Sequence, residues 1–104
     1  MTNPRPDHPQ RAAEQHRRAQ TFALHWAERA ETEYDTATEH EDKARRFAGK
    51  AYLAEPMADE RRLAQFHGIR STEALKLAEM WARVARALAD TGKPHQTDGG
   101  AEDG

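Results

Sequence analysis

The 104-residue chain contains 33% charged and 37% hydrophobic residues, which suffices for one domain with a thin core. Its formal net charge of −2 provides no overall attraction to nucleic acid or acidic membranes, and the absence of cysteine excludes disulfides, thiolate metal sites and cysteine nucleophiles. No apolar signal-peptide segment and no run of about 18 apolar residues is found in the sequence. We therefore expect a small cytoplasmic protein that does not cross a membrane.

Both ends of the chain have the composition of tails. Residues 1–9 contain three prolines, and residues 91–104 combine glycine, proline and acidic residues. Neither composition supports a packed helix, because proline interrupts helical hydrogen bonding and glycine-rich acidic segments bury little apolar surface. We expect flexible tails at 1–9 and 91–104, with a helical domain at 10–90 between them.

Two long helices are predicted within this domain, at about residues 10–54 and 57–90. Between residues 10 and 53 there is no proline and one glycine, Gly49, whereas Glu55-Pro56 is the clear interior break. Mostly small side chains recur every seven residues, which keeps them on one face of each helix. These stripe residues are Ala23, Ala30, Ala37, Ala44, Ala51, Met57, Ala64, Ser71, Ala78 and Ala85. The pattern predicts an all-α, antiparallel helical hairpin.

A reversal at Glu55-Pro56 determines which residues face each other, because both helices advance by the same rise per residue. The numbers of facing residues should then sum to about 111, so that large side chains meet small ones. The expected pairs are Trp26 with Ala85, Trp81 with Ala30, and Phe47 with Ala64.

The segment Thr36-Ala37-Thr38-Glu39 matches a capping box, a pattern found at helix N-termini. It provides an alternative in which the first helix restarts there and the domain has three helices.

Bulky apolar side chains extend over more than one face of the predicted hairpin, so two helices cannot cover them all. A two-fold dimer reuses one patch on each subunit, which predicts a homodimeric four-helix bundle. An N-terminal segment folded back over the patch is the alternative. The candidate residues for binding this or another protein partner are Phe22, Trp26, Leu77, Trp81, Val84 and Leu88.

The sequence contains no clear catalytic or metal-binding motif. Its single serine, Ser71, lies in the small-residue stripe, and no Gly-rich phosphate loop or Ser-His-Asp arrangement is present. No histidine has a carboxylate three residues before it, so the Glu-x-x-His pattern of di-iron bundles is missing. His40 and His67 should lie near each other, but a structural role is favoured over a shared ligand. We expect no enzymatic activity, cofactor or metal.

Charge is unevenly distributed along the first helix. Residues 28–42 hold seven acidic side chains against Arg29 alone, and basic residues follow. Such polarity could orient a protein partner, a head-to-tail contact or a phosphate backbone, but the sequence favours an ordinary solvated helix surface. The basic cluster comprises Lys43, Arg45, Arg46, Lys50, Arg61 and Arg62.

Residues 63–77 resemble a helix-turn-helix motif. The residues that carry the resemblance are Ala64, Gly68, Ile69, Ala74 and Leu77. It implies a turn at Gly68 and a second helix in the DNA major groove, directing Thr72, Glu73, Leu75 and Lys76 toward bases. His67 at a usually apolar position, and Glu73 and Glu79 opposing phosphate, depart from the pattern.

The overall composition, rich in Ala, Arg, Glu, Thr and His, resembles that of many small uncharacterised helical proteins of high-GC actinobacteria or their phages. That resemblance implies a bacterial setting and no activity. The sequence favours a non-enzymatic helical protein-interaction or adaptor module. The alternatives are a small DNA-binding regulator and, more remotely, a metal-binding helical bundle.

Overall fold

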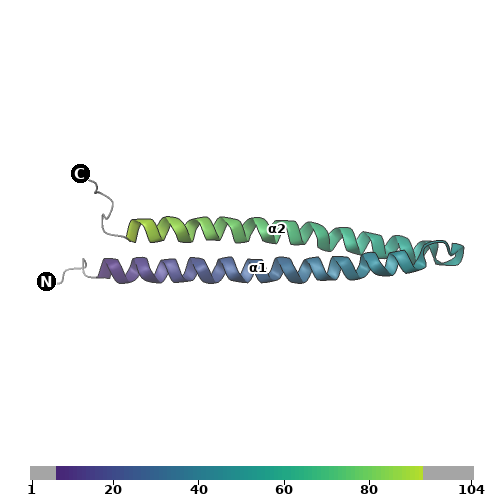
Figure 1. The fold of residues 1–104 in the computed structure, drawn as a ribbon, viewed down its shortest axis with the longest axis horizontal. Helices are drawn as coiled ribbons and strands as arrows, with labels where there is room; N and C mark the ends of the chain where they lie inside the picture. The colour runs from purple at the N-terminus through teal and green to yellow at the C-terminus, as the bar shows by residue number, and fades with distance from the viewer. Residues whose placement is uncertain (1–6, 93–104) are drawn as a thin grey trace, which may run out of the picture. The chain divides into compact units, whose positions relative to one another are not determined.

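Figure 1 presents a computed structural model, which describes residues 7–92 of the chain. Helix α1 spans Asp7–Phe47 and helix α2 spans Ala54–Gly92, with the short 3-10 helix η1 at Ala51–Leu53 between them. The described residues contain no strand, and the two long helices form a hairpin, so the predicted fold class is confirmed. Most of the expected tail residues, 1–6 and 93–104, lie outside the described part of the chain. Neither α1 nor α2 has a stretch apolar and long enough to span a bilayer.

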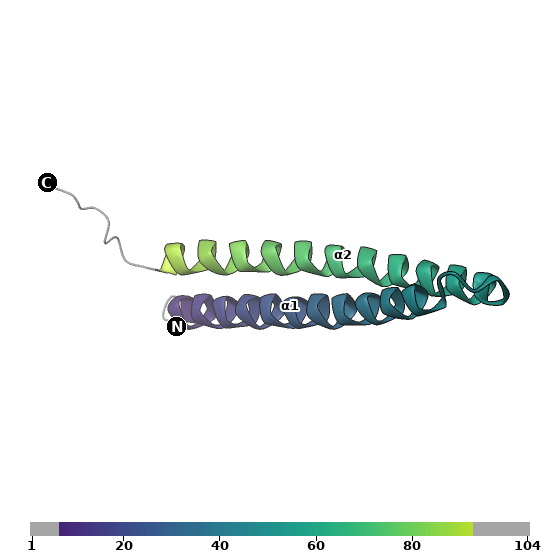
Figure 2. The same cartoon turned by 45° about the vertical axis from the view of Figure 1, so that its right-hand side comes forward.

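Contacts within the chain divide it into two units. One unit combines Met1–Ala23 with Glu79–Gly104, and the other is Leu24–Ala78, which contains the turn. In each unit a stretch of α1 lies beside a stretch of α2 and runs antiparallel to it (Figures 1 and 2). Each site described below lies within one of these units.

Alanine forms nearly all of the core. Among the residues whose burial is described, only alanines and Glu33 are buried. The buried alanines are Ala19, Ala30, Ala44, Ala64, Ala74, Ala78 and Ala85. Five of them belong to the predicted small-residue stripe, which is thereby confirmed as the contact face of the helices. Ala51 is exposed because it lies in η1, beyond the end of α1.

The chain reverses earlier than the sequence predicts. Helix α1 ends at Phe47 instead of near residue 54, and Gly49 follows with a φ of 84°. This left-handed conformation is common just after a helix and favours glycine, which has no Cβ. Lys50 donates its backbone N–H to the carbonyl of Phe47 at 3.3 Å, and Leu53 donates to Lys50 at 2.9 Å. The reversal is therefore built around Gly49.

Pro56 is not the point at which the chain reverses between the two helices. It is the third residue of α2, in the first helical turn, where a backbone N–H has no partner within the helix. Proline is tolerated there because the missing N–H removes no hydrogen bond and the fixed φ suits a helix. The predicted break at Glu55-Pro56 is thus wrong, and this pair belongs to the start of α2.

The register of the hairpin differs from the prediction accordingly. Facing residues have numbers that sum to 100–103 instead of 111, as the contacts of Glu33 with His67 and of Phe22 with Trp81 illustrate. The expected pairs of Trp26 with Ala85, Trp81 with Ala30, and Phe47 with Ala64 are wrong, because moving the turn shifts every pair.

Helix α1 continues through the predicted capping box. The hydroxyl of Thr36 donates to the carbonyl of Thr32 at 3.0 Å, and that of Thr38 donates to the carbonyl of Tyr34 at 3.0 Å. These are bonds of threonines inside a helix, which reach back one turn, whereas a capping residue accepts from the following N–H groups. The alternative with a helix restart at residue 36 is therefore wrong.

Residues 63–77 form part of one continuous helix, α2. Within the described chain the only glycine with positive φ is Gly49, so Gly68 makes no turn. The turn that the helix-turn-helix resemblance implies is consequently wrong for this segment.

Candidate functional site

A buried carboxylate, Glu33, is the centre of a polar cluster in the unit Leu24–Ala78. Its Oε1 lies 2.6 Å from Nδ1 of His67, and its Oε2 accepts a hydrogen bond from Nε of Arg70 at 3.1 Å. Nε of Arg29, one turn earlier on α1, lies 3.4 Å from the same Oε2. Burial of a charge is unfavourable unless it is paired and hydrogen-bonded, and Glu33 is both.

A second glutamate–histidine pair lies beside the first. In this pair the histidine belongs to α1 and the glutamate to α2, the reverse of the first pair. Nδ1 of His40 on α1 is 2.6 Å from Oε1 of Glu60 on α2. On each helix the glutamate precedes the histidine by seven residues, so Glu33 and His40 on α1 mirror Glu60 and His67 on α2. An ionised carboxylate can only accept a hydrogen bond, so the Nδ1 of His67 is the donor to Glu33, whose pKa is lowered. The two pairs bridge α1 and α2 reciprocally.

The environment of Glu33 favours its charged form. The hydrogen bond from His67 and then that from Arg70 lower the pKa of the Glu33 carboxyl, and these effects outweigh the opposing effect of desolvation. Glu33 is therefore ionised at neutral pH and acts as the anion between two cationic or hydrogen-bond-donating groups of α2.

The chemistry available to this cluster is limited by its other contacts. The hydroxyl of Ser71 donates to the backbone carbonyl of Ala30 at 2.8 Å, which is a structural bond between the helices. Within the described residues, no group of three or more histidine or acidic side chains is arranged to hold a metal ion. The proximity of His40 and His67 predicted from the sequence is confirmed, and both side chains are engaged with glutamates.

The six candidate partner-binding residues separate into two places. Four of them line an apolar hollow of about 330 Å³ in the unit formed by the ends of the chain. Within it the rings of Phe22 and Trp81 have centroids 4.8 Å apart and planes inclined by 48°. The hollow is lined by Gln15, Arg18, Ala19, Phe22, Trp81, Val84 and Leu88.

The other two candidates, Trp26 and Leu77, line a smaller hollow in the unit Leu24–Ala78. Its volume is about 180 Å³, and its wall is partly charged because Glu33 and Arg70 contribute to it. The sequence identified the aromatic and aliphatic members of both hollows, and the structure places the two hollows in different units.

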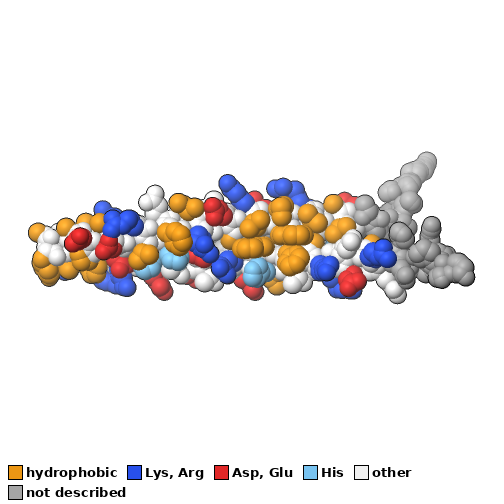
Figure 3. Space-filling model, turned by 180° about the vertical axis from the view of Figure 1, so that it is seen from behind, with side chains coloured by type: hydrophobic (Ala, Val, Ile, Leu, Met, Phe, Trp, Pro, Cys, Tyr) orange, Lys and Arg blue, Asp and Glu red, His pale blue; other side chains and the backbone are white. Residues whose placement is uncertain are grey.

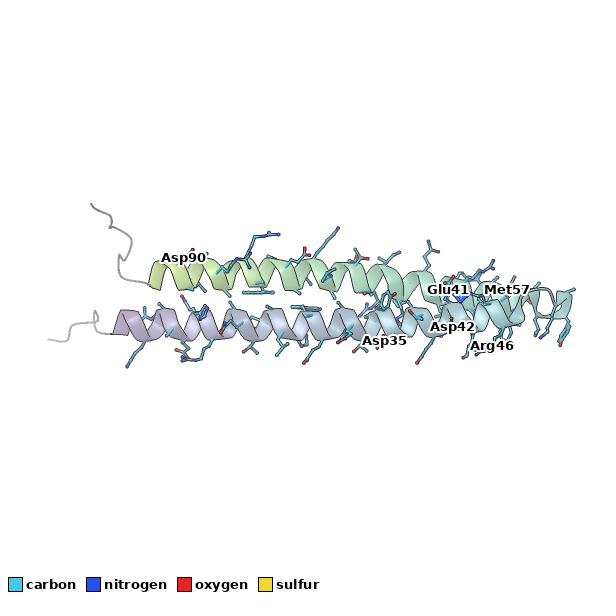
Figure 4. All side chains as sticks on the ribbon, viewed as in Figure 1. Asp35, Glu41, Asp42, Arg46, Met57 and Asp90 are labelled. Atoms are coloured by element: carbon cyan, nitrogen blue, oxygen red, sulfur yellow. The ribbon has the colours of Figure 1, made fainter. Side chains whose placement is uncertain are left out.

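The predicted basic residues are interleaved with acidic ones. Arg45 donates to Asp42 at 3.1 Å, and Arg62 forms an ion pair with Asp59. Figure 4 labels Asp42 and Arg46 on α1, and both line a hollow together with Lys43. Acidic side chains lie about one helical turn from the basic ones, so this region carries both charges and is not a purely basic surface.

Sequence reasoning missed Glu33 and Glu60 as members of the site. A usable signal exists, because Glu33 precedes the stripe residue Ala37 by four and Glu60 follows Met57 by three. These spacings place both on the helix face that carries the stripe. The signal was hidden among many solvated acidic residues of similar spacing.

Comparisons of the chain with protein-family models, with curated proteins and with solved structures find no match.

Proposed function

We propose that this protein is a non-enzymatic, cytoplasmic interaction module that acts by binding other polypeptides, beginning with a second copy of itself. The observation that carries the proposal is the inverted distribution of side-chain size. Small alanines are buried, whereas Phe22, Phe66 and Ile69 are 41%, 53% and 53% exposed. A helical hairpin with this distribution has most of its bulky apolar surface available to a partner.

The area of a side chain sets how much its burial contributes to stability. Complete burial of one large apolar side chain contributes about 1.5–3 kcal/mol, whereas alanine contributes far less because its side chain is a single methyl group. An alanine core lets α1 and α2 approach closely but obtains little from the hydrophobic effect. Covering several exposed large side chains in a complex would supply the larger share of the hydrophobic stabilisation.

The distribution of apolar side chains over the surface supports the same proposal. One face of the molecule presents apolar groups interspersed with charged ones (Figure 3). Protein interfaces commonly combine an apolar centre with a polar, charged surround, and aromatic residues are enriched in them. The hollow beside Phe22 and Trp81 adds a concave apolar surface in one unit.

Sedimentation equilibrium over a concentration series tests the proposal. We expect the mass of a dimer at micromolar concentration and dissociation on dilution. Trp26 and Trp81 line the two hollows and provide an independent readout, since their emission should shift to longer wavelength as the dimer dissociates. A monomer at every concentration, with unchanged tryptophan emission, would contradict self-association.

A further inference from the structure

Helix α2 carries a second heptad seam besides the one that contacts α1. The contact seam includes Ala64, His67, Ser71, Ala74 and Ala78, spaced alternately by three and four residues. The same spacing, displaced by one residue, gives Leu63, Phe66, Arg70, Glu73 and Leu77, which we call the outer seam. One residue corresponds to about 100° around a helix. The outer seam therefore lies along the side of α2, at roughly a right angle to the contact seam.

The outer seam is accessible along its length in the unit Leu24–Ala78. Leu63 is 41% exposed and Phe66 is 53% exposed, Glu73 is exposed, and Leu77 is half-buried. The Arg70 side chain is 43% exposed although its Nε donates to Glu33. Its guanidinium carbon lies 5.5 Å from the centre of the Phe66 ring, which helps to hold the group in place.

The charges of the outer seam select one arrangement of two copies. In an antiparallel pair of α2 helices, each a-type position faces a d-type position of the other copy. A two-fold axis between Arg70 and Glu73 sets Arg70 against Glu73 of the second copy, twice. The flanking layers then combine Phe66 with Leu77 of the second copy. A parallel pair would set Arg70 against Arg70 and Glu73 against Glu73, which is unfavourable.

We propose that two copies of this chain associate through the outer seam of α2, antiparallel, with reciprocal Arg70–Glu73 ion pairs at the centre. This inference rests on the proposed self-association and specifies its surface and register. The arrangement is isologous, because one patch meets itself across a two-fold axis, and it generates a closed four-helix assembly.

Reversing the two charges separately tests this register. In Glu73→Arg each ion pair becomes a contact between two arginines, and in Arg70→Glu it becomes a contact between two glutamates. We expect each variant to dimerise at least about tenfold more weakly than the parent protein. Mixed together, the two variants restore both opposite-charge contacts, so native mass spectrometry should find the heterodimer in excess over either homodimer.

Two controls separate this outcome from general damage. Glu79→Arg makes the same charge change on α2 outside the outer seam and should dimerise like the parent protein. Circular dichroism must show that the variants are folded, because Arg70→Glu also removes a partner of Glu33. If that variant is unfolded, Arg70→Gln replaces it in the mixture, where it still relieves the repulsion between arginines.

The results distinguish the two levels of the proposal. A dimeric parent protein whose Glu73→Arg variant dimerises as well as Glu79→Arg would overturn the outer-seam register and leave the interaction module intact. A statistical mixture without excess heterodimer would overturn it as well. A parent protein that is monomeric at every concentration would overturn both proposals.

Discussion

The imidazole rings of His40 and His67 are stacked, with centroids 5.7 Å apart and planes inclined by 13°. Each ring is also bonded through Nδ1 to a glutamate of the other helix, so that two reciprocal pairs form one continuous polar arrangement. Alanine predominates elsewhere in the core, where identical small residues provide little to distinguish one register from another. A slip of one helix by a turn would separate Glu33 from His67 and leave a buried carboxylate without that partner, which is unfavourable.

Stability should decrease in acid because the pKa of Glu33 is lowered in the folded state. The unfolded chain, with an ordinary glutamate pKa near 4.5, binds the proton more readily, so protonation favours unfolding. The contribution of Glu33 to stability is fully present at pH values above the unfolded-state pKa. It is lost as the pH falls through the lowered folded-state pKa. Thermal melts at a series of pH values should show Glu33→Gln with a lower midpoint at neutral pH and a shallower acid decline.

The matched control for this measurement is Glu31→Gln, which changes an exposed carboxylate on the same helix. Its acid dependence should follow that of the parent protein. If Glu33→Gln declines as steeply as Glu31→Gln, then Glu33 does not contribute to the acid dependence.

Gly68→Ala should stabilise the protein by up to about 1 kcal/mol, because alanine has the higher helix propensity. Gly68 lies inside α2, and an added Cβ meets no atom within 4 Å outside its own helical turn. Urea unfolding monitored by circular dichroism measures the difference. A destabilised variant would contradict the placement of Gly68 inside a continuous helix with open space beside it.

Gly49→Ala should have the opposite effect to Gly68→Ala and lower the free energy of unfolding by roughly 1–2 kcal/mol. Its φ of 84° lies in the left-handed region, where an L residue with a Cβ is strained whether or not there is space. Gly49→Asn is the matched comparison, since asparagine tolerates this conformation better than alanine. Equal stability of the parent, alanine and asparagine proteins would show that the left-handed turn is not required.

Ala44→Leu should destabilise by about 1–3 kcal/mol, because Ala44 is 2% exposed and a larger side chain forces the helices apart. Ala27→Leu makes the same change at an exposed position of α1 and should stay within about 0.5 kcal/mol of the parent protein. Chemical denaturation of both variants provides the comparison. Similar effects at the two positions would refute the close-packed alanine interface.

The residues of the candidate site could be predicted from the sequence only in part. Phe22, Trp81 and Val84 were identified as bulky surface residues, and they do line one hollow. Trp26 was grouped with them because of its size, and it lies in the other unit. Side-chain size can be read locally, whereas the neighbours of a side chain depend on how two distant segments align.

By itself the sequence determined that the chain forms two long helices with small residues on their contact faces, because helix propensity and seven-residue spacing act within a few turns. The tertiary structure decided where the chain reverses, since Gly49 can adopt a positive φ while Pro56 fits the first turn of α2. That choice sets the register, and the register alone brings Glu33 to His67 and His40 to Glu60. Pairing of buried polar groups is a property of two helices together, and no single helix specifies it.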